Sequence, residues 1–250
     1  MINNSLGTGK TTTLVEAILQ LLKRSETKIL VTASSNSACD EIALRLAKYL
    51  EQLDIKRCLA RIYARSSEGK MDIIDDDLLE HSNMYCGQFY PSIEILHEYR
   101  VVVCTLSVVA KLATGKFGRD EQGNEMYTHL FIDEVAAAME ADALLAITAI
   151  LKNKSRLIIS GDHKQLGPIL KSKRAEELGL DISLMERLLE RECYRVDNDT
   201  GNYDRTIQTR LRRNYRSHPA IVNLYSGLYY NHNVEPHCKI GKYYFIYKKN

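Results

Sequence analysis

The sequence predicts an α/β fold in which a parallel sheet is covered by helices. Short continuous apolar runs alternate with longer segments in which apolar residues recur at helical spacing. Two of the apolar runs end in acidic residues, and one helical segment directly follows a glycine-rich turn. The chain has 250 residues, 45% of them hydrophobic, which is enough for one large domain or two small ones with a buried core.

The expected elements follow one another in a regular order. Helical spacing is found at residues 10–24, 37–53, 107–113, 140–151, 184–192 and 219–230. The second of these helices begins with Ser37 and Glu41, which come close to a capping signal. Buried strands are expected at residues 28–33, 56–64, 100–105, 129–134 and 156–162, and a strand-like run at 206–211. An irregular connection or a small helical insertion is expected at residues 65–91, and loops are expected at 115–125 and 197–204.

Composition narrows the class of protein. Lys and Arg number 34 and Asp and Glu 32, so any nucleic-acid binding must come from local patches. Six cysteines occur singly, without zinc spacing, which is typical of reduced and mostly buried thiols. No signal peptide and no apolar run of about 18 residues is recognisable, so we expect a cytoplasmic protein with no membrane partner.

The stretch SLGTGKTTT, residues 5–13, contains most of a phosphate-binding loop. Gly7 and Gly9 permit backbone N–H groups to turn inward, Lys10 can supply a cation, and Thr11 can supply a hydroxyl to Mg²⁺. Asn4 stands where the pattern has its first glycine. Because Met1 and Ile2 are the only apolar residues before it, the strand that leads into such a loop is expected to be missing, which would leave strand edges unpaired. The alternative is a glycine-rich turn before an ordinary helix.

Acidic and amide side chains follow two later strands. The run FIDE places Asp133 where it can bind a metal and Glu134 where it can polarise an attacking water. In GDHKQLGP, Gln165 is the candidate sensor of a terminal phosphate because its amide both donates and accepts. A strand ending in two acids and a Gly/Pro turn are each common by themselves. Their order after a phosphate loop indicates an ATPase.

Two further segments carry candidate ligand contacts. In LRRNYRSHP, Arg216 could neutralise charge on a transferred phosphate and Tyr215 could stack on a base, or the segment is a basic loop before a helix. In TASSNSACDE, residues 32–41, hydroxyls and an amide at a helix start suit the phosphates of a nucleic acid, or they only cap the helix.

Taken in order, these segments resemble superfamily 1 helicases of the RNA-helicase branch related to the nonsense-mediated-decay helicases. Within that branch, SNSACDEIALRL and NYRSHPAI are most similar to the Armitage-type proteins of small-RNA silencing. The resemblance covers residues 4 to about 231 and implies a RecA-like P-loop fold. It implies ATP contacts from Gly7, Thr8, Gly9, Lys10, Thr11, Thr12 and Tyr215, and Mg²⁺ ligands at Thr11 and Asp133. It further implies catalytic roles for Lys10, Glu134, Gln165 and Arg216, and nucleic-acid contacts from Ser34, Ser35, Asn36, Ser37 and Thr105.

The same resemblance divides the chain. Residues 1–170 are expected to form a first RecA-like ATPase domain without its first strand, and residues 171–250 a linker and the start of a second domain. The expected function is that of an ATP-dependent RNA helicase fragment, with single-stranded RNA or DNA and small-RNA silencing proteins as partners. We expect that the chain alone does not unwind a duplex. The alternative is a catalytically degenerate module that binds nucleic acid or protein, which Asn4 favours.

Overall fold

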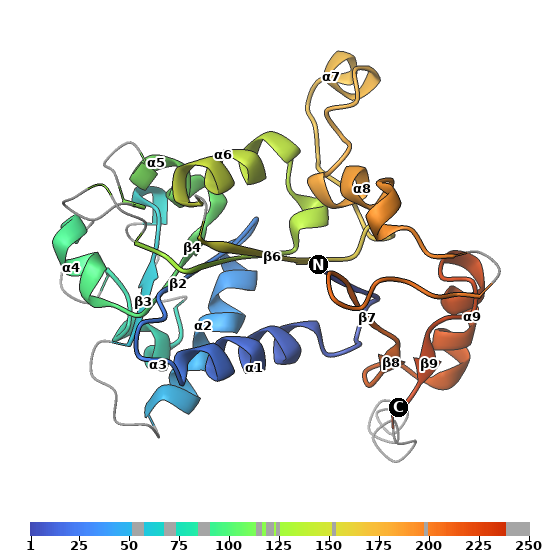
Figure 1. Ribbon diagram of the computed structural model, residues 1–250, viewed down its shortest axis with the longest axis horizontal. Helices are drawn as coiled ribbons and strands as arrows, with labels where there is room; N and C mark the ends of the chain where they lie inside the picture. Colours follow the sequence, from blue (N-terminus) through green and yellow to red (C-terminus); the bar gives the residue numbers. More distant parts are fainter. Residues whose placement is uncertain are drawn as a thin grey trace, which may run out of the picture.

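The chain folds around a parallel sheet with helices on both of its faces (Figure 1). The computed structural model describes residues 1–51, 58–67, 74–84, 91–113, 117–118, 123, 126–151, 154–197 and 200–238. Within these residues the sheet has seven strands in the order β3-β4-β2-β5-β6-β1-β7, and all neighbours pair in parallel. The strands are β1 (Ile2–Asn4), β2 (Ile29–Ala33), β3 (Leu59–Ile62), β4 (Val101–Thr105), β5 (His129–Asp133), β6 (Arg156–Gly161) and β7 (Thr209–Leu211). The predicted α/β fold is confirmed.

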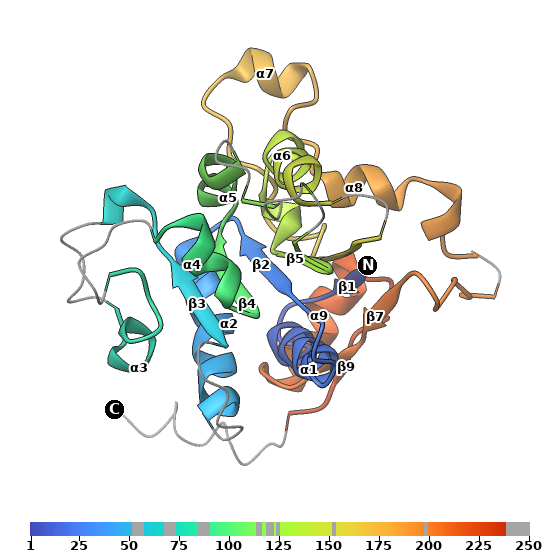
Figure 2. The same cartoon turned by 60° about the vertical axis from the view of Figure 1, so that its left-hand side comes forward.

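Two apolar cores lie on opposite faces of the sheet, because successive side chains of a strand point to opposite sides. On one face, Leu30 and Ile132 pack with α5 (Leu106–Ala113), α6 (Glu140–Ile150) and α8 (Leu184–Leu189). On the other face, Val31 and Phe131 pack with α1 (Lys10–Leu22) and α2 (Asn36–Leu50). Figure 2, turned by 60°, shows the two groups of helices on either side of the strands. Continuous apolar runs predicted these strands because both of their faces are covered.

Most of the remaining elements are short, and α9 is the longest of them. They are η2 (Arg65–Ser67), α3 (Asp76–Leu79), α4 (Ile93–Glu98), η4 (Val135–Ala137), α7 (Lys173–Glu177), η5 (Glu192–Tyr194), β8 (Arg213–Asn214), α9 (Pro219–Tyr229) and β9 (Glu235–Pro236). The sequence did not predict α7, which stands out from the body of the molecule in both views (Figures 1 and 2). Most of the expected loop at 115–125, and the first residues of the expected strand at 56–64, lie outside the described residues.

The cap of α2 differs from the prediction. The helix begins at Asn36, and Ser35 caps it by accepting a hydrogen bond from the backbone N–H of Ala38 at 3.2 Å. Ser35 has extended backbone angles, which let its hydroxyl reach an N–H three residues ahead, whereas Ser37 already lies in the first turn. The helix therefore begins one residue before the predicted start, and its cap lies two residues before Ser37.

The strand before the phosphate loop is present, contrary to the prediction. β1 has only three residues, yet Ile2 pairs with Ser160 of β6 on one side and with Thr209 of β7 on the other. Ladder hydrogen bonds on both sides compensate for the short apolar run that made the sequence pattern too weak to recognise. Asn4, in place of the usual glycine, is the last residue of this strand and pairs with Leu211.

The strand β7 follows the predicted domain boundary at residue 170 but joins the same sheet as β1. The chain then continues through β8, α9 and β9, which pack beside the end of the sheet that carries β1 (Figure 1). The division into residues 1–170 and 171–250 stays a prediction, and the sheet takes strands from both sides of it.

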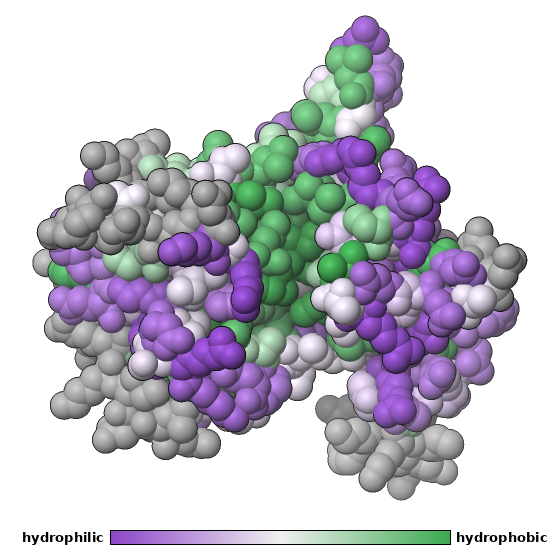
Figure 3. Space-filling view, in the orientation of Figure 1, coloured by the Kyte–Doolittle hydropathy of each residue, from purple (hydrophilic) through white to green (hydrophobic). Residues whose placement is uncertain are grey.

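Apolar surface gathers in the middle of the face seen in Figure 3, over β6 and α6. The exposed apolar side chains of these two elements are Leu144, Leu145 and Leu157. In the part of the chain that the structure describes, no helix has both the length and the apolar character needed to cross a bilayer.

Candidate functional site

The glycine-rich loop leaves β1 and turns directly into α1. Gly7 and Gly9 have φ values of 73° and 87°, in the left-handed region that glycine adopts without strain. The hydroxyl of Thr8 donates to the carbonyl of Ser5 at 2.8 Å, and that of Thr13 donates to the carbonyl of Gly9 at 3.0 Å. The loop therefore delivers the N-terminus of a 13-residue helix to the carboxyl end of the sheet, the geometry that suits an anion.

Residues 214–216, far along the sequence, contact this loop. The side-chain amide of Asn214 donates to the carbonyl of Leu6 at 2.5 Å, and the backbone N–H of Tyr215 donates to the carbonyl of Gly7 at 2.9 Å. A Cβ atom added to Gly7 would lie 2.6 Å from Nδ2 of Asn214 and 2.7 Å from Cβ of Arg216. Gly7 is thus required by this close approach. Asn214, which is fully buried, was not predicted, and its only signal in the sequence was an amide that follows two arginines.

Lys10 and Glu134 form an ion pair across the site. The ammonium Nζ lies 2.5 Å from Oε1 of Glu134, and the side chains are 14% and 36% exposed. Glu134 has φ 51° and ψ 34°, a left-handed conformation that is uncommon for a residue with a side chain. Strained residues of this kind cluster at functional sites, and here the strain directs the carboxylate toward Lys10.

Asp133, the last residue of β5, is buried and 2% exposed. Burial raises its carboxyl pKa above the usual value, the charge of Glu134 adds to this rise, and the ammonium of Lys10 opposes it. Its Oδ1 atom is buried without a hydrogen-bond partner among the described residues. Mg²⁺ prefers oxygen ligands such as carboxylates. A buried carboxylate oxygen of Asp133 without a partner, close to the phosphate-binding loop, therefore fits this ion.

Gln165 lies in the turn after β6. Its Nε2 donates to Oδ2 of Asp162 at 2.7 Å, and the same oxygen accepts the hydroxyl of Tyr230 at 2.7 Å. Asp162 is 1% exposed, so these contacts hold a buried carboxylate between the sheet and the end of α9. Neither Asp162 nor Tyr230 was among the predicted site residues.

These residues line one cleft with a volume of about 770 Å³, a size that suits small ligands. The lining residues are 5–13, Arg45, Glu134, Gln165, Leu211, Tyr215 and Arg216. The cleft brings together all the predicted nucleotide and catalytic residues except Asp133, which is buried next to Glu134. Arg45 of α2 was not predicted, and its Nη1 donates to the hydroxyl of Thr12 at 2.9 Å.

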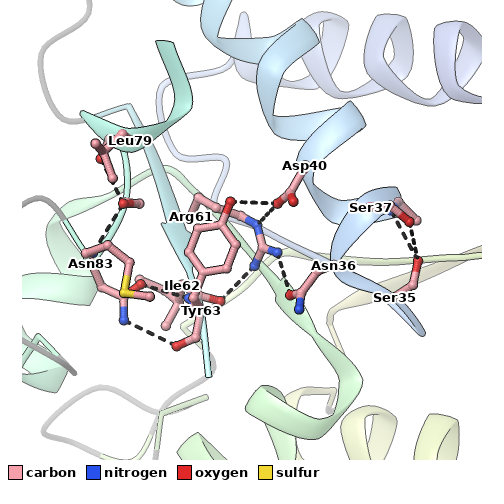
Figure 4. Close-up of polar contacts among 12 residues, drawn as sticks. Ser35, Asn36, Ser37, Asp40, Arg61, Ile62, Tyr63, Leu79 and Asn83 are labelled. Carbon is pink, nitrogen blue, oxygen red and sulfur yellow. Dashed lines mark hydrogen bonds and ion pairs between the residues drawn. The ribbon is translucent and has the colours of Figure 1, made fainter. Parts of the chain in front are cut away.

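The predicted nucleic-acid residues occupy two different environments. Ser34, Ser35, Asn36 and Ser37 are all exposed where β2 leads into α2. Thr105 ends the neighbouring strand opposite Ala33 but is only 7% exposed, and its hydroxyl lies 3.0 Å from that of Ser107. The serine segment is therefore open to a ligand, whereas the Thr105 side chain is buried and its hydroxyl contacts that of exposed Ser107. Figure 4 shows the polar contacts around the serine segment.

The described cysteines are free thiols that form no disulfide and no metal-binding group. Cys39, Cys58 and Cys104 are buried free thiols, as predicted, while Cys193 is exposed and Cys238 is partly buried. Cys86 lies outside the described residues. Within the described ranges, no three His, Cys, Asp or Glu side chains gather as a metal-binding group.

A parallel sheet, a glycine-rich loop that leads into a helix, and an Asp-Glu pair at the carboxyl end of β5, two strands from β1, define a P-loop nucleotide-binding protein. The sequence also matches the model of the AAA domain family over residues 1–90 and 88–173. Among curated proteins, putative helicase mov-10-B.1 of Danio rerio is 36% identical over 92% of this chain and 22% of its own length. Probable RNA helicase armi of Drosophila melanogaster is 29% identical over 92% of this chain and 20% of its own.

A solved complex of an Arterivirus helicase, nonstructural protein 10, with DNA aligns with 95% of this chain and 41% of its own, with 17% identity and a TM-score of 0.49. The chain belongs to the AAA domain family, and the curated proteins to which it is similar include helicases of the Mov10 and armi type. It spans about a fifth of the length of these curated relatives.

Proposed function

We propose that the chain binds Mg-ATP in the cleft and hydrolyses it in a manner coupled to binding of a single-stranded nucleic acid. The observation that carries this proposal is the convergence of Lys10, Glu134, Gln165 and Arg216 on one cleft, although they come from four separate segments. A cation, a carboxylate, an amide and a guanidinium around one cleft form the set of groups that phosphoryl transfer requires.

The ion pair between Lys10 and Glu134 indicates how the two residues would act. The oxygens of a polyphosphate bound in the loop would offer the Lys10 ammonium more charged acceptors than the single carboxylate of Glu134 does. When Lys10 turns to the phosphate, Glu134 is released and can orient a water molecule and accept its proton. Thr11 and Asp133 are the residues that would hold Mg²⁺, which neutralises charge on the phosphate oxygens when bound.

Gln165 and Arg216 would complete the site from the opposite side. The hydrogen bond from Gln165 to buried Asp162 holds its amide at the mouth of the cleft, where it can sense a terminal phosphate. The guanidinium of Arg216 would stabilise the charge that moves to the leaving oxygens. Tyr215, 55% exposed at the edge of the cleft, offers a face on which adenine can stack.

The nucleic-acid contact is assigned to the exposed segment of Ser34 to Ser37. Hydroxyl and amide groups at the start of α2 suit phosphate oxygens and carry no base information. RNA is the proposed strand because a relative is named a probable RNA helicase. A cytoplasmic role with small-RNA silencing proteins and a domain boundary near residue 170 are proposed from the same likeness.

Phosphate release measured with and without single-stranded RNA tests the proposal. We expect Mg²⁺-dependent turnover that RNA stimulates, and a loss of at least about 100-fold in Glu134→Gln, which keeps the size of the side chain but not its basicity. Glu186→Gln in α8, at an exposed residue outside the cleft lining, is the matched control and should turn over normally. RNA binding without any turnover would contradict the enzymatic proposal and favour a binding module.

A further inference from the structure

A buried arginine lies beneath the exposed serine segment. Arg61, in the edge strand β3, has a side chain that is 0% exposed. Its Nε donates to Oδ1 of Asp40 at 2.7 Å and its Nη1 to the carbonyl of Ile62 at 2.8 Å. Its planar guanidinium also stacks on the ring of Tyr63, 3.9 Å from the centroid. Burying a guanidinium costs free energy unless its N–H groups are hydrogen-bonded. These contacts therefore hold the Arg61 side chain in one orientation.

The remaining arm of this guanidinium reaches the helix start. Nη2 of Arg61 donates to Oδ1 of Asn36 at 2.9 Å, as Figure 4 shows. Tyr63 supports the arrangement because its hydroxyl donates to the same oxygen of Asp40 at 2.8 Å. Asn36 and Asp40 are one helical turn apart on α2, so Arg61 fixes the first turn of this helix at two points.

The direction of the hydrogen bond decides what Asn36 can do. A guanidinium only donates, so the oxygen of the Asn36 amide must face Arg61. The amide NH₂, which only donates, is then turned away from Arg61. Asn36 is exposed, and phosphate oxygens only accept. Without Arg61 the amide could rotate and present either end, of which one would repel a phosphate.

We propose that Arg61 is a positioning residue that turns the Asn36 amide so that its NH₂ group donates to a phosphate of the bound nucleic acid. This inference rests on the proposed nucleic-acid binding by the serine segment. Arg61 would not touch the nucleic acid, because it is buried, and would act only through Asn36. The strand β3 would thereby contribute to binding although none of its own side chains reaches the ligand.

The test is the affinity for a fluorescein-labelled oligouridylate, measured by anisotropy at one fixed salt concentration. Arg61→Lys keeps the charge beside Asp40 but lacks the fork that reaches Asn36, and we expect about tenfold weaker binding. Asn36→Ala should weaken binding to a similar extent. The double variant should bind no more weakly than Asn36→Ala alone, because Arg61 has then lost the group through which it acts.

Arg100→Lys is the matched control. Arg100 also donates to fixed acceptors, the carbonyls of Leu22 and Arg24, but it lies at the amino end of β4, away from the serine segment. This variant should bind like the unmodified chain. Equal affinity of Arg61→Lys and the unmodified chain would overturn the inference, and so would losses that multiply in the double variant.

A second variant covers the case in which Arg61→Lys does not fold. Asn36→Asp keeps an oxygen acceptor for Arg61 but removes the NH₂ donors, so we expect binding at least as weak as that of Asn36→Ala. Unchanged affinity of Asn36→Asp would refute the inference. If the unmodified chain binds no oligouridylate, the proposed nucleic-acid function fails and this inference falls with it, whereas unaltered binding by the variants refutes the inference alone.

Discussion

Replacing Gly7 by alanine tests whether the C-terminal segment is packed on the phosphate loop. Two costs act at this position. The residue has a φ of 73°, and a left-handed conformation costs a residue with a side chain about 1–2 kcal/mol. The added Cβ would also lie within 2.7 Å of both Asn214 Nδ2 and Arg216 Cβ.

Neither contact can be relieved by a simple rotation. Nδ2 of Asn214 already donates to the carbonyl of Leu6 and to the hydroxyl of Tyr225, and Cβ of Arg216 is fixed to the backbone. Overpacking of this kind costs about 1–3 kcal/mol in addition to the backbone strain. Gly7→Ala should therefore destabilise the fold and push residues 214–216 away from the loop, which would also weaken ATP binding.

Gly201→Ala is the matched control for the strain alone. Gly201 has a φ of 66°, but nothing lies within 4 Å of an added Cβ, and it is outside the cleft lining. Urea unfolding followed by circular dichroism should give Gly7→Ala a free energy of unfolding lower than that of Gly201→Ala by about 1–3 kcal/mol. Equal values for the two variants would refute the close packing of residues 214–216 on the loop.

Three further perturbations follow from contacts in the same structure. Tyr230→Phe removes a hydrogen-bond donor from buried Asp162 and should lower the free energy of unfolding by about 1–3 kcal/mol. Tyr229→Phe, at an exposed tyrosine, should change it by nothing measurable, and equal urea midpoints for the two variants would contradict this. Burial, with the charges of two nearby arginines, lowers the pKa of His129, so stability should fall as the pH drops below the ordinary histidine value of about 6.5. His129→Gln should flatten that decline in a pH series of thermal melts, and an unchanged slope would show that another group titrates. Arg45→Ala should raise the KM for ATP severalfold with little change in Tm, because its ion pair is exposed but its guanidinium reaches the loop; an unaltered KM would remove Arg45 from the site.

Much of the site could be predicted because its residues follow apolar runs at fixed places. Asp133 ends a strand whose central residues are apolar, Glu134 follows it directly, and the parallel sheet brings the ends of such strands to one edge. Lys10 and Thr11 could be recognised because a loop that binds phosphate must open a helix. In these cases a local pattern and the fold specify the same position.

The supporting residues could not be predicted because their roles depend on contacts distant in the sequence. Asn214 acts on a carbonyl 208 residues away, and only the folded chain brings the two together. β1 was missed because its stability comes from the strands on either side of it rather than from its own three residues. Arg61 did leave a signal, since a charge inside an apolar strand requires a buried partner, but nothing in the strand indicated that Asn36 is one of its partners.

Binding of ATP to the cleft is tested most directly by isothermal titration with and without Mg²⁺, using the whole chain and its Lys10→Ala variant. We expect saturable binding at one site that is much weaker without Mg²⁺, because the orphaned oxygen of Asp133 and the hydroxyl of Thr11 would then lack their ion. Binding should be lost in Lys10→Ala, which removes the cation from the loop. Heat signals that are the same for both chains, or that do not depend on Mg²⁺, would contradict the assignment of this cleft as a nucleotide site.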